Sequence, residues 1–150
     1  MRIIHPMAGA IALLCICAFW LSTVAAEAFG TQPMVVAVKT AIPWGFILLI
    51  PALALTGISG VRITKNKGST LTRRKLRRMP FIALNGLLIL IPSALYLASA
   101  ARAGSFDTPF IAVQSIELIA GAANIVLLGL NFRDGLRLRG RLSFTPGDAQ

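Results

Sequence analysis

Charged side chains are scarce in this chain of 150 residues, of which 13% are charged and 56% are hydrophobic. A soluble domain of this length carries about a quarter charged residues, because a small globule has a large surface in contact with water. The shortage therefore excludes an ordinary soluble domain. We expect a single domain whose outer surface faces lipid over most of its area.

Histidine and cysteine are also rare: the chain has one histidine, His5, and two cysteines, Cys15 and Cys17. A single histidine excludes a haem held by two histidines of the same chain. On a helix the two cysteines point to faces about 200° apart, so they do not pair readily, and further metal ligands are missing nearby. We therefore expect no metal and no cofactor.

Recognisable catalytic arrangements are missing as well. The sequence has no glycine loop of the kind that binds phosphate, no dinucleotide-binding fingerprint, and no histidine placed to activate a serine or a cysteine. We therefore expect that the protein is not an enzyme.

Positive charge is abundant, and the net charge of +10 raises nucleic-acid binding as an alternative. The distribution of the 15 lysines and arginines argues against it. All except Lys39 and Arg102 lie in the N-terminal tail, one internal loop or the C-terminal tail, beside hydrophobic segments. Such charge is a signal of membrane topology. We expect the lipid bilayer, and not nucleic acid, to be the partner.

Four apolar segments, at about 7–28, 41–61, 79–101 and 108–132, are each long enough to cross a hydrocarbon core of about 30 Å as a helix. The predicted fold class is all-α, a four-helix transmembrane bundle that forms one domain over residues 1–142. The short connection at 102–107 makes the third and fourth helices an antiparallel hairpin, which we expect to be the tightest helix pair. Residues 143–150 are predicted to be a disordered tail.

The connection between the second and third segments is strongly basic and holds no acidic residue. Its lysines and arginines are Arg62, Lys65, Lys67, Arg73, Arg74, Lys75, Arg77 and Arg78. Because cytoplasmic connections carry the excess of positive charge, this loop and both termini are predicted to be cytoplasmic, in the plasma membrane, the cell inner membrane. Arg73, Arg74, Lys75, Arg77 and Arg78 are also predicted to attract anionic lipid headgroups, at about 1 kcal/mol per charge.

The first segment has an alternative interpretation. Arg2, the apolar run and the small residues at 24–28 resemble a secretory signal peptide that is cleaved after residue 26 or 28. The run at 7–24 is longer than the usual apolar core of about 7–15 residues, which favours a retained helix. Either outcome leaves the other three helices with the same orientation.

Polar or small residues recur at spacings of three and four on one face of each helix of the predicted hairpin. With the apolar residues that continue the spacing, the two series are Gln114, Glu117, Gly121, Asn124, Leu128 and Asn131 in the last segment and Asn85, Ile89, Pro92, Tyr96 and Ser99 in the third. With a turn near residue 105, the predicted pairs are Asn85 with Asn124, Ile89 with Gly121, Pro92 and Ser93 with Glu117, and Tyr96 with Gln114. Because lipid offers no hydrogen bonds, polar side chains turn inward and pair across helices. The simplest interpretation is a structural polar seam.

Glu117 is the residue of this seam that best suits a functional role, because a carboxylate near the middle of the membrane is costly and points to a site. No lysine or arginine is expected at its level, since Lys39 is assigned to the first connection. We therefore expect a neutral carboxyl group with hydrogen bonds to nearby polar side chains, unless a water-filled cavity reaches it. The candidate intramembrane site is Glu117, Gln114, Tyr96, Ser93, Asn85 and Asn124.

Two segments echo each other at similar depth, each with a glycine six residues before a proline: Gly45 and Pro51, and Gly86 and Pro92. Proline removes a backbone hydrogen bond and favours a kink, and matched interrupted helices point to a midplane site in transporters. Because proline is frequent in membrane helices, coincidence is the simpler explanation.

Two functions fit these patterns. The first is a non-catalytic accessory or structural membrane component that associates with itself, as a homo-oligomer, or with a larger membrane complex, and it predicts a buried Glu117 without a cavity. The alternative is a proton- or cation-coupled transporter of a small solute that uses Glu117, and it predicts a water-accessible cavity at mid-depth.

Overall fold

The computed structural model describes the backbone of residues 4–64 and 70–143 and the side chains of residues 5–60 and 78–137. The elements are α1 (Ile4–Phe29), α2 (Gln32–Thr64), α3 (Thr70–Asn85), the π-helix η1 (Gly86–Leu90), α4 (Ile91–Arg102) and α5 (Thr108–Ser143), with no strand in the described chain. Four stretches are long and apolar enough to cross a membrane: His5–Phe29, Gln32–Gly60, Arg78–Arg102 and Thr108–Arg137. The predicted four-helix bundle is confirmed, and the chain is a multi-pass membrane protein. Beyond Ser143, the predicted tail lies outside the described residues.

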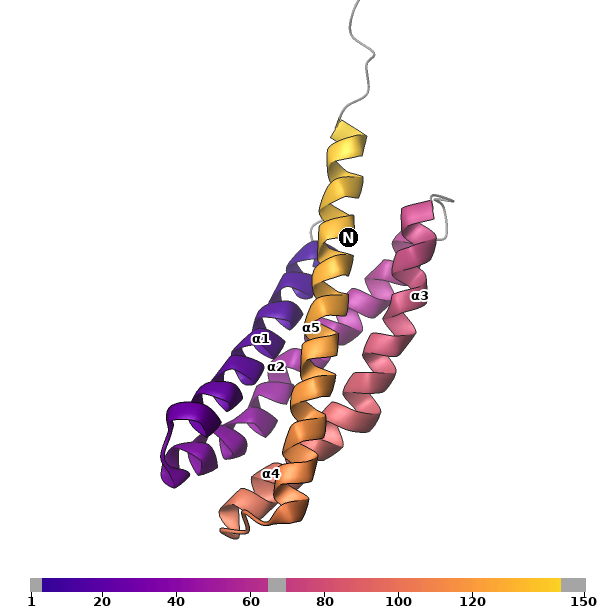
Figure 1. The fold of residues 1–150 in the computed structure, drawn as a ribbon. Coiled ribbons are helices and arrows are strands. Elements are labelled where there is room, and N and C mark those ends of the chain that lie inside the picture. Colours follow the sequence, from indigo (N-terminus) through magenta and orange to yellow (C-terminus); the bar gives the residue numbers. More distant parts are fainter. Residues whose placement is uncertain (1–3, 65–69, 144–150) are drawn as a thin grey trace, which may run out of the picture.

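The four spans form a ring in which each packs against two neighbours (Figure 1). α1 and α4 each pack against both α2 and α5, and α3 continues through η1 into α4 as one span. α2 and α5 are therefore diagonal partners, and no Cα atoms of their described residues lie within 8 Å of each other. The turns at 30–31 and 103–107 lie at one end of the bundle, which we call the hairpin end, and the opposite end is called the basic end.

The most extensive packing in the bundle lies between α1 and α2, and the prediction that the last two spans form the tightest pair is wrong. A Cβ atom on Gly45 would collide with the ring of Phe19, so glycine at this position admits the ring against the backbone of α2. Phe19 also meets Phe46 edge to face, with ring centroids 6.4 Å apart. Side-chain size, more than polarity, sets how closely two membrane helices approach.

α2 begins at Gln32, nine residues before the start of the predicted span. Gly30 ends α1 with a hydrogen bond from its N–H to the carbonyl of Ala26 (2.9 Å), and Pro33 stands in the first turn of α2, where its missing N–H costs nothing. The connection is therefore only residues 30–31. As a result Lys39 lies inside the membrane-spanning helix and not in a loop.

The turn between α4 and α5 is specified by glycine and aspartate. Gly104 has a φ of +69°, Ser105 N–H bonds to the carbonyl of Ala100, and Gly104 N–H bonds to that of Ala101, which together form a Schellman motif. Asp107 then accepts a hydrogen bond from Phe110 N–H (3.1 Å) as the N-cap of α5. The predicted antiparallel hairpin follows from this turn.

The two proline segments do not behave alike. α2 remains α-helical through Pro51, whereas the residues before Pro92 form the π-helix η1, in which Ile91 N–H bonds to the carbonyl of Gly86. A π turn inserts one extra residue and so relieves the clash of a proline ring with the preceding turn. This difference supports coincidence over an internal repeat.

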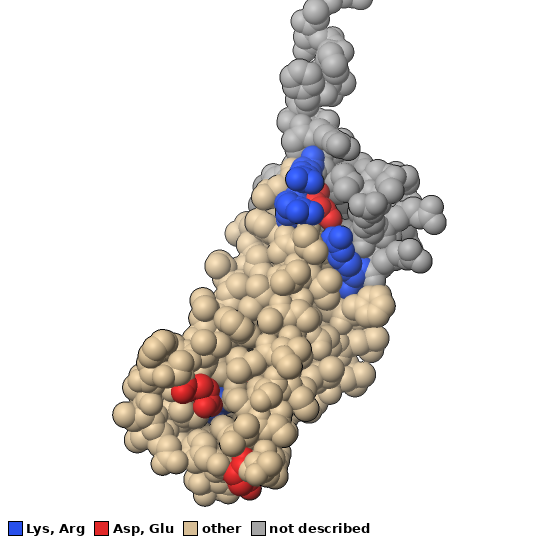
Figure 2. Space-filling model, viewed as in Figure 1, with Lys and Arg blue, Asp and Glu red and all other residues tan. Residues whose placement is uncertain are grey.

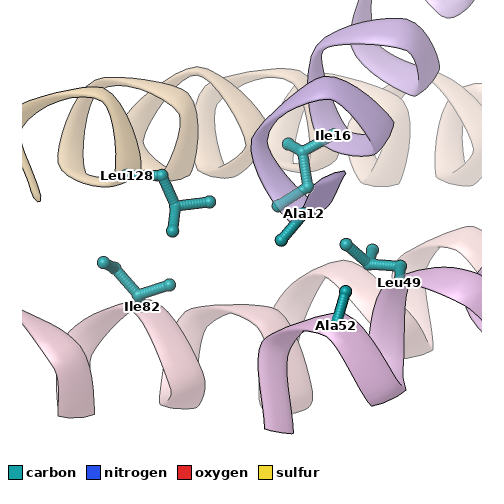
Figure 3. Packing of buried hydrophobic residues seen from close by; sticks show 6 residues of the cluster. All are labelled: Ala12, Ile16, Leu49, Ala52, Ile82 and Leu128. Carbon is teal, nitrogen blue, oxygen red and sulfur yellow. The ribbon is translucent and has the colours of Figure 1, made fainter. Parts of the chain in front are cut away.

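Two apolar clusters fill the interior. The cluster towards the basic end joins all four spans through Ala12, Ile16, Leu49, Ala52, Ile82 and Leu128, whose side chains point toward one another (Figure 3). The cluster at the hairpin end is Ala26, Val35, Leu97, Ala101 and Phe110.

Candidate functional site

A buried ion pair joins α2 and α5 across the diagonal of the bundle. Lys39 Nζ lies 2.7 Å from Glu117 Oε2, with the two side chains 1% and 12% exposed. Because the backbones of these helices do not approach each other, the long lysine side chain spans the gap. The prediction that no lysine or arginine shares the level of Glu117 is wrong, and a neutral carboxyl group is no longer needed to explain its burial.

The error came from the boundary of α2. Lys39 is seven residues after Gln32 and Glu117 is nine residues after Thr108, so both lie about 10–14 Å along their helices from the hairpin end. A second span that begins at residue 41 leaves Lys39 in the first connection, where it is not expected to pair with Glu117. The signal that could have found it is chemical: an intramembrane carboxylate pairs with a cation, and few cations of this chain lie away from the basic end.

The central pair of the predicted seam is formed. Asn85 Nδ2 donates hydrogen bonds to Asn124 Oδ1 (2.9 Å) and to the carbonyl of Ala120 (2.8 Å), and the Asn124 side chain is fully buried. The predicted register of the hairpin is therefore confirmed at this level.

Trp20 of α1, and not Ile89, fills the space at Gly121. A Cβ atom on Gly121 would lie 2.9 Å from Trp20 Cδ1, and Trp20 Nε1 donates a hydrogen bond to the carbonyl of Leu118 (2.9 Å). Ile89 is partly exposed on the outside of the bundle. The glycine therefore serves contact between α1 and α5, a pairing that analysis of the hairpin alone could not include.

The hairpin-end part of the seam differs from its predicted pairing. Gln114 is buried, and its amide nitrogen and oxygen have no hydrogen-bond partner within the described part of the chain, so the predicted bond with Tyr96 is wrong. Tyr96 is 42% exposed. Ser93 is buried, but the hydrogen bond that the structure shows for Glu117 goes to Lys39.

A partly open cavity of about 60 Å³ lies between the four spans beside Glu117. All four spans line it, and Phe19, Trp20, Phe46, Thr23 and Glu117 are among the lining residues. The lining is otherwise apolar. Glu117 is thus buried, paired and adjacent to a cavity, a combination that neither function predicted in full.

A second ion pair lies at the basic end. Arg78 Nη1 of α3 is 3.0 Å from Asp134 Oδ2 of α5, and Arg133 Nη2 is 3.6 Å from Asp134 Oδ1. His5 of α1 also bonds to Ser59 of α2 at 2.8 Å near this end. Figure 2 shows basic side chains gathered at this end, whereas the charged side chains visible near the opposite end are mainly acidic. The side chains of Arg73, Arg74, Lys75 and Arg77 lie outside the described ones.

The outer faces of the spans are apolar, as a lipid environment requires: Trp44, Ile47 and Ile119 are each more than 70% exposed. Among the described residues, no group of three or more histidine, cysteine, aspartate or glutamate side chains could hold a metal ion. Comparison of the chain with protein-family models, curated proteins and solved structures finds no match. The fold and the site together define a multi-pass helical membrane bundle with a charge-paired core.

Proposed function

We propose that this protein is a non-catalytic accessory or structural component of the cell inner membrane that associates with itself or with a larger membrane complex. The observation that carries this proposal is the Lys39–Glu117 pair, in which the most costly intramembrane charge is neutralised by another part of the same bundle. Trp20 and Asn85 likewise direct their polar groups to other spans. Polar groups used in this way hold helices together and need no substrate.

The proposed orientation has both termini and the basic end in the cytoplasm, with anionic headgroups bound there. It is supported by the excess of lysine and arginine in the connection after α2 and in the C-terminal tail. A reporter enzyme that is active only in the cytoplasm, fused after Gln150, should be active. Activity of a periplasm-specific reporter at the same point would contradict the orientation.

Assembly variants test the accessory role. Gly121→Leu should disrupt the bundle and any complex that depends on it, because the new side chain displaces Trp20, whereas Gly129→Leu is the matched control, with open space around its Cβ position. The double variant Lys39→Gln/Glu117→Gln keeps the layer neutral and should assemble normally. The measurement is the size of the purified complex in detergent. Loss of a solute-transport phenotype in a correctly assembled double variant would contradict the proposal.

The second candidate function is proton- or cation-coupled transport of a small solute with Glu117 as the carrier group. The cavity beside Glu117 favours it specifically, since a purely structural carboxylate does not need one. Reconstituted protein should then show pH-dependent solute flux that Glu117→Gln abolishes. Flux that is unchanged in that variant would remove Glu117 from the carrier role.

A further inference from the structure

The cavity beside Glu117 has the chemistry of a cation site with apolar walls. Its described lining includes one ionisable residue, Glu117, together with the aromatic residues Phe19, Trp20 and Phe46. A carboxylate attracts a cation by charge, and aromatic faces add an attraction that is strongest in a desolvated site. Anions are disfavoured by the same carboxylate.

The ion pair itself indicates which kind of cation the carboxylate accepts. Lys39 is a primary alkylammonium group on a tether, and its Nζ already lies 2.7 Å from Glu117 Oε2. Metal cations such as Mg²⁺ and Ca²⁺ require six or more oxygen ligands, whereas Glu117 and Thr23 are the lining residues whose side chains carry oxygen atoms. An alkylammonium ion needs fewer oxygens, because its carbon atoms can lie against aromatic rings.

The volume limits the size of such a ligand. A water molecule needs about 15 Å³ of a cavity volume measured in this way, so a cavity of about 60 Å³ holds roughly four heavy atoms. Benzene occupies engineered cavities of about 150 Å³, so a ring of that size is too large. Methylammonium, with one carbon and one nitrogen, fits this volume, and a primary alkylammonium ion of roughly four heavy atoms is about the largest that does.

Charge balance determines what else must happen on binding. The Lys39–Glu117 pair is neutral, and a second cation would leave one uncompensated charge in a buried layer, which is strongly unfavourable. Neutrality is kept if Lys39 gives one proton to water and remains as a neutral amine while the ligand bonds to Glu117. One cation enters, one proton leaves, and no bond between heavy atoms forms or breaks.

We propose that this cavity binds a small primary alkylammonium ion of up to roughly four heavy atoms, such as methylammonium, which replaces Lys39 as the partner of Glu117 and releases one proton. The proposal deepens the second candidate function and rests on Glu117 as its cation-binding group. It names the substrate class and the stoichiometry of exchange.

Other titratable groups on the packed helices do not line this cavity in the described structure. On the hairpin half of the bundle they are Cys15, Cys17 and Glu27 of α1, Tyr96 and Arg102 of α4, and Asp107 before α5. Glu27, Tyr96, Arg102 and Asp107 are exposed. The pH dependence is therefore assigned to the exchange at Lys39 and Glu117.

The test measures binding of methylammonium chloride to the full-length protein in lipid nanodiscs. Trp20 fluorescence reports it in a Trp44→Phe background, because the chain has two tryptophans and Trp44 lies outside the cavity. We expect a saturable response whose apparent affinity rises about tenfold per pH unit, as release of one proton requires. Sodium chloride and tetramethylammonium chloride, which lack the N–H donors, should give no response.

Variants separate the two partners. Glu117→Gln and the double variant Lys39→Gln/Glu117→Gln should both lose the response, and the double variant controls for misfolding caused by an unpaired Lys39. Lys39→Gln removes the tethered competitor, so methylammonium should bind at least tenfold more tightly and should raise the melting temperature of this variant.

Absence of a methylammonium response in the unmodified site, an equal response to sodium, or a response that persists in the folded double variant would overturn the proposal. Binding without flux in liposomes would uphold the site while contradicting transport. Failure to bind in a protein that assembles normally overturns this inference and leaves the accessory function intact.

Discussion

The two ends of the bundle each hold an ion pair on the buried face of α5, yet the pairs differ in reach and exposure. At the hairpin end Lys39 crosses the diagonal to Glu117 and is 1% exposed, whereas at the basic end Arg78 is 26% exposed and pairs with Asp134 between neighbouring spans. Arg133 stands beside Asp134 as a second cation. The comparison teaches that an equal pairing distance does not imply equal energetic importance.

The reason lies in what happens when one partner is lost. Removing one member of the Lys39–Glu117 pair leaves an uncompensated charge in a medium of low dielectric constant. Removing Arg78 leaves the buried Asp134 with a second cation, Arg133, beside it. The Lys39–Glu117 pair, called the deep pair, therefore restricts how the bundle can pack. The Arg78–Asp134 pair, called the shallow pair, mainly adds to the charge of the basic end. The following variants test this difference, beginning with the largest expected effect.

Substitution of either member of the deep pair should be the most damaging change. Lys39→Gln or Glu117→Gln alone is expected to lower the free energy of unfolding by about 3–5 kcal/mol, because the other charge stays buried. The double variant restores neutrality and should lie within about 1 kcal/mol of the original. Equilibrium unfolding in mixed micelles measures all three. A Lys39→Gln variant as stable as the original protein would show that the pair is not buried as described.

Gly121→Ala should come next. The added Cβ lies 2.9 Å from Trp20 Cδ1, so the indole must shift and its bond to the carbonyl of Leu118 is strained, at a cost of about 1–3 kcal/mol. Gly129→Ala is the matched control on the same helix, with open space at its Cβ position, and it should be neutral or gain up to about 1 kcal/mol from helix propensity. Equal effects of the two variants in the same unfolding measurement would exclude contact with Trp20 as the cause.

At the basic end, Arg78→Gln should cost less than about 1 kcal/mol, because Arg78 is partly exposed and Arg133 still faces Asp134. The loss should shrink further as salt rises, since exposed charges are screened. Unfolding measured at low and high salt checks both points. A cost similar to that of Lys39→Gln would contradict the proposed difference between the two ends.

Sequence patterns were enough to predict what depends on local composition and on the hairpin. The apolar segments, the turn at 102–107 and the pairing of Asn85 with Asn124 follow from span length and helical spacing. Contacts between spans that are distant in the chain could not be predicted. No local sequence pattern indicates that Lys39 of α2 contacts Glu117, or that Trp20 contacts Gly121. Periodicity identifies the inward face of a helix, but the ring order of the spans decides which side chain meets it.

The smallest expected effect concerns the central amide pair, which lies between the two ends and carries no charge. Asn85 donates to both Asn124 and the carbonyl of Ala120, so Asn85→Leu removes two hydrogen bonds but also a polar group from the membrane. Hydrogen bonds between membrane helices contribute about 0.6 kcal/mol on average and up to about 1.7 kcal/mol. A double-mutant cycle with Asn124→Leu should therefore give a coupling energy in that range. A coupling energy of several kcal/mol would instead show that the Asn85–Asn124 pair is a main determinant of the stability of the bundle. The difference between the deep and shallow ion pairs would then matter less.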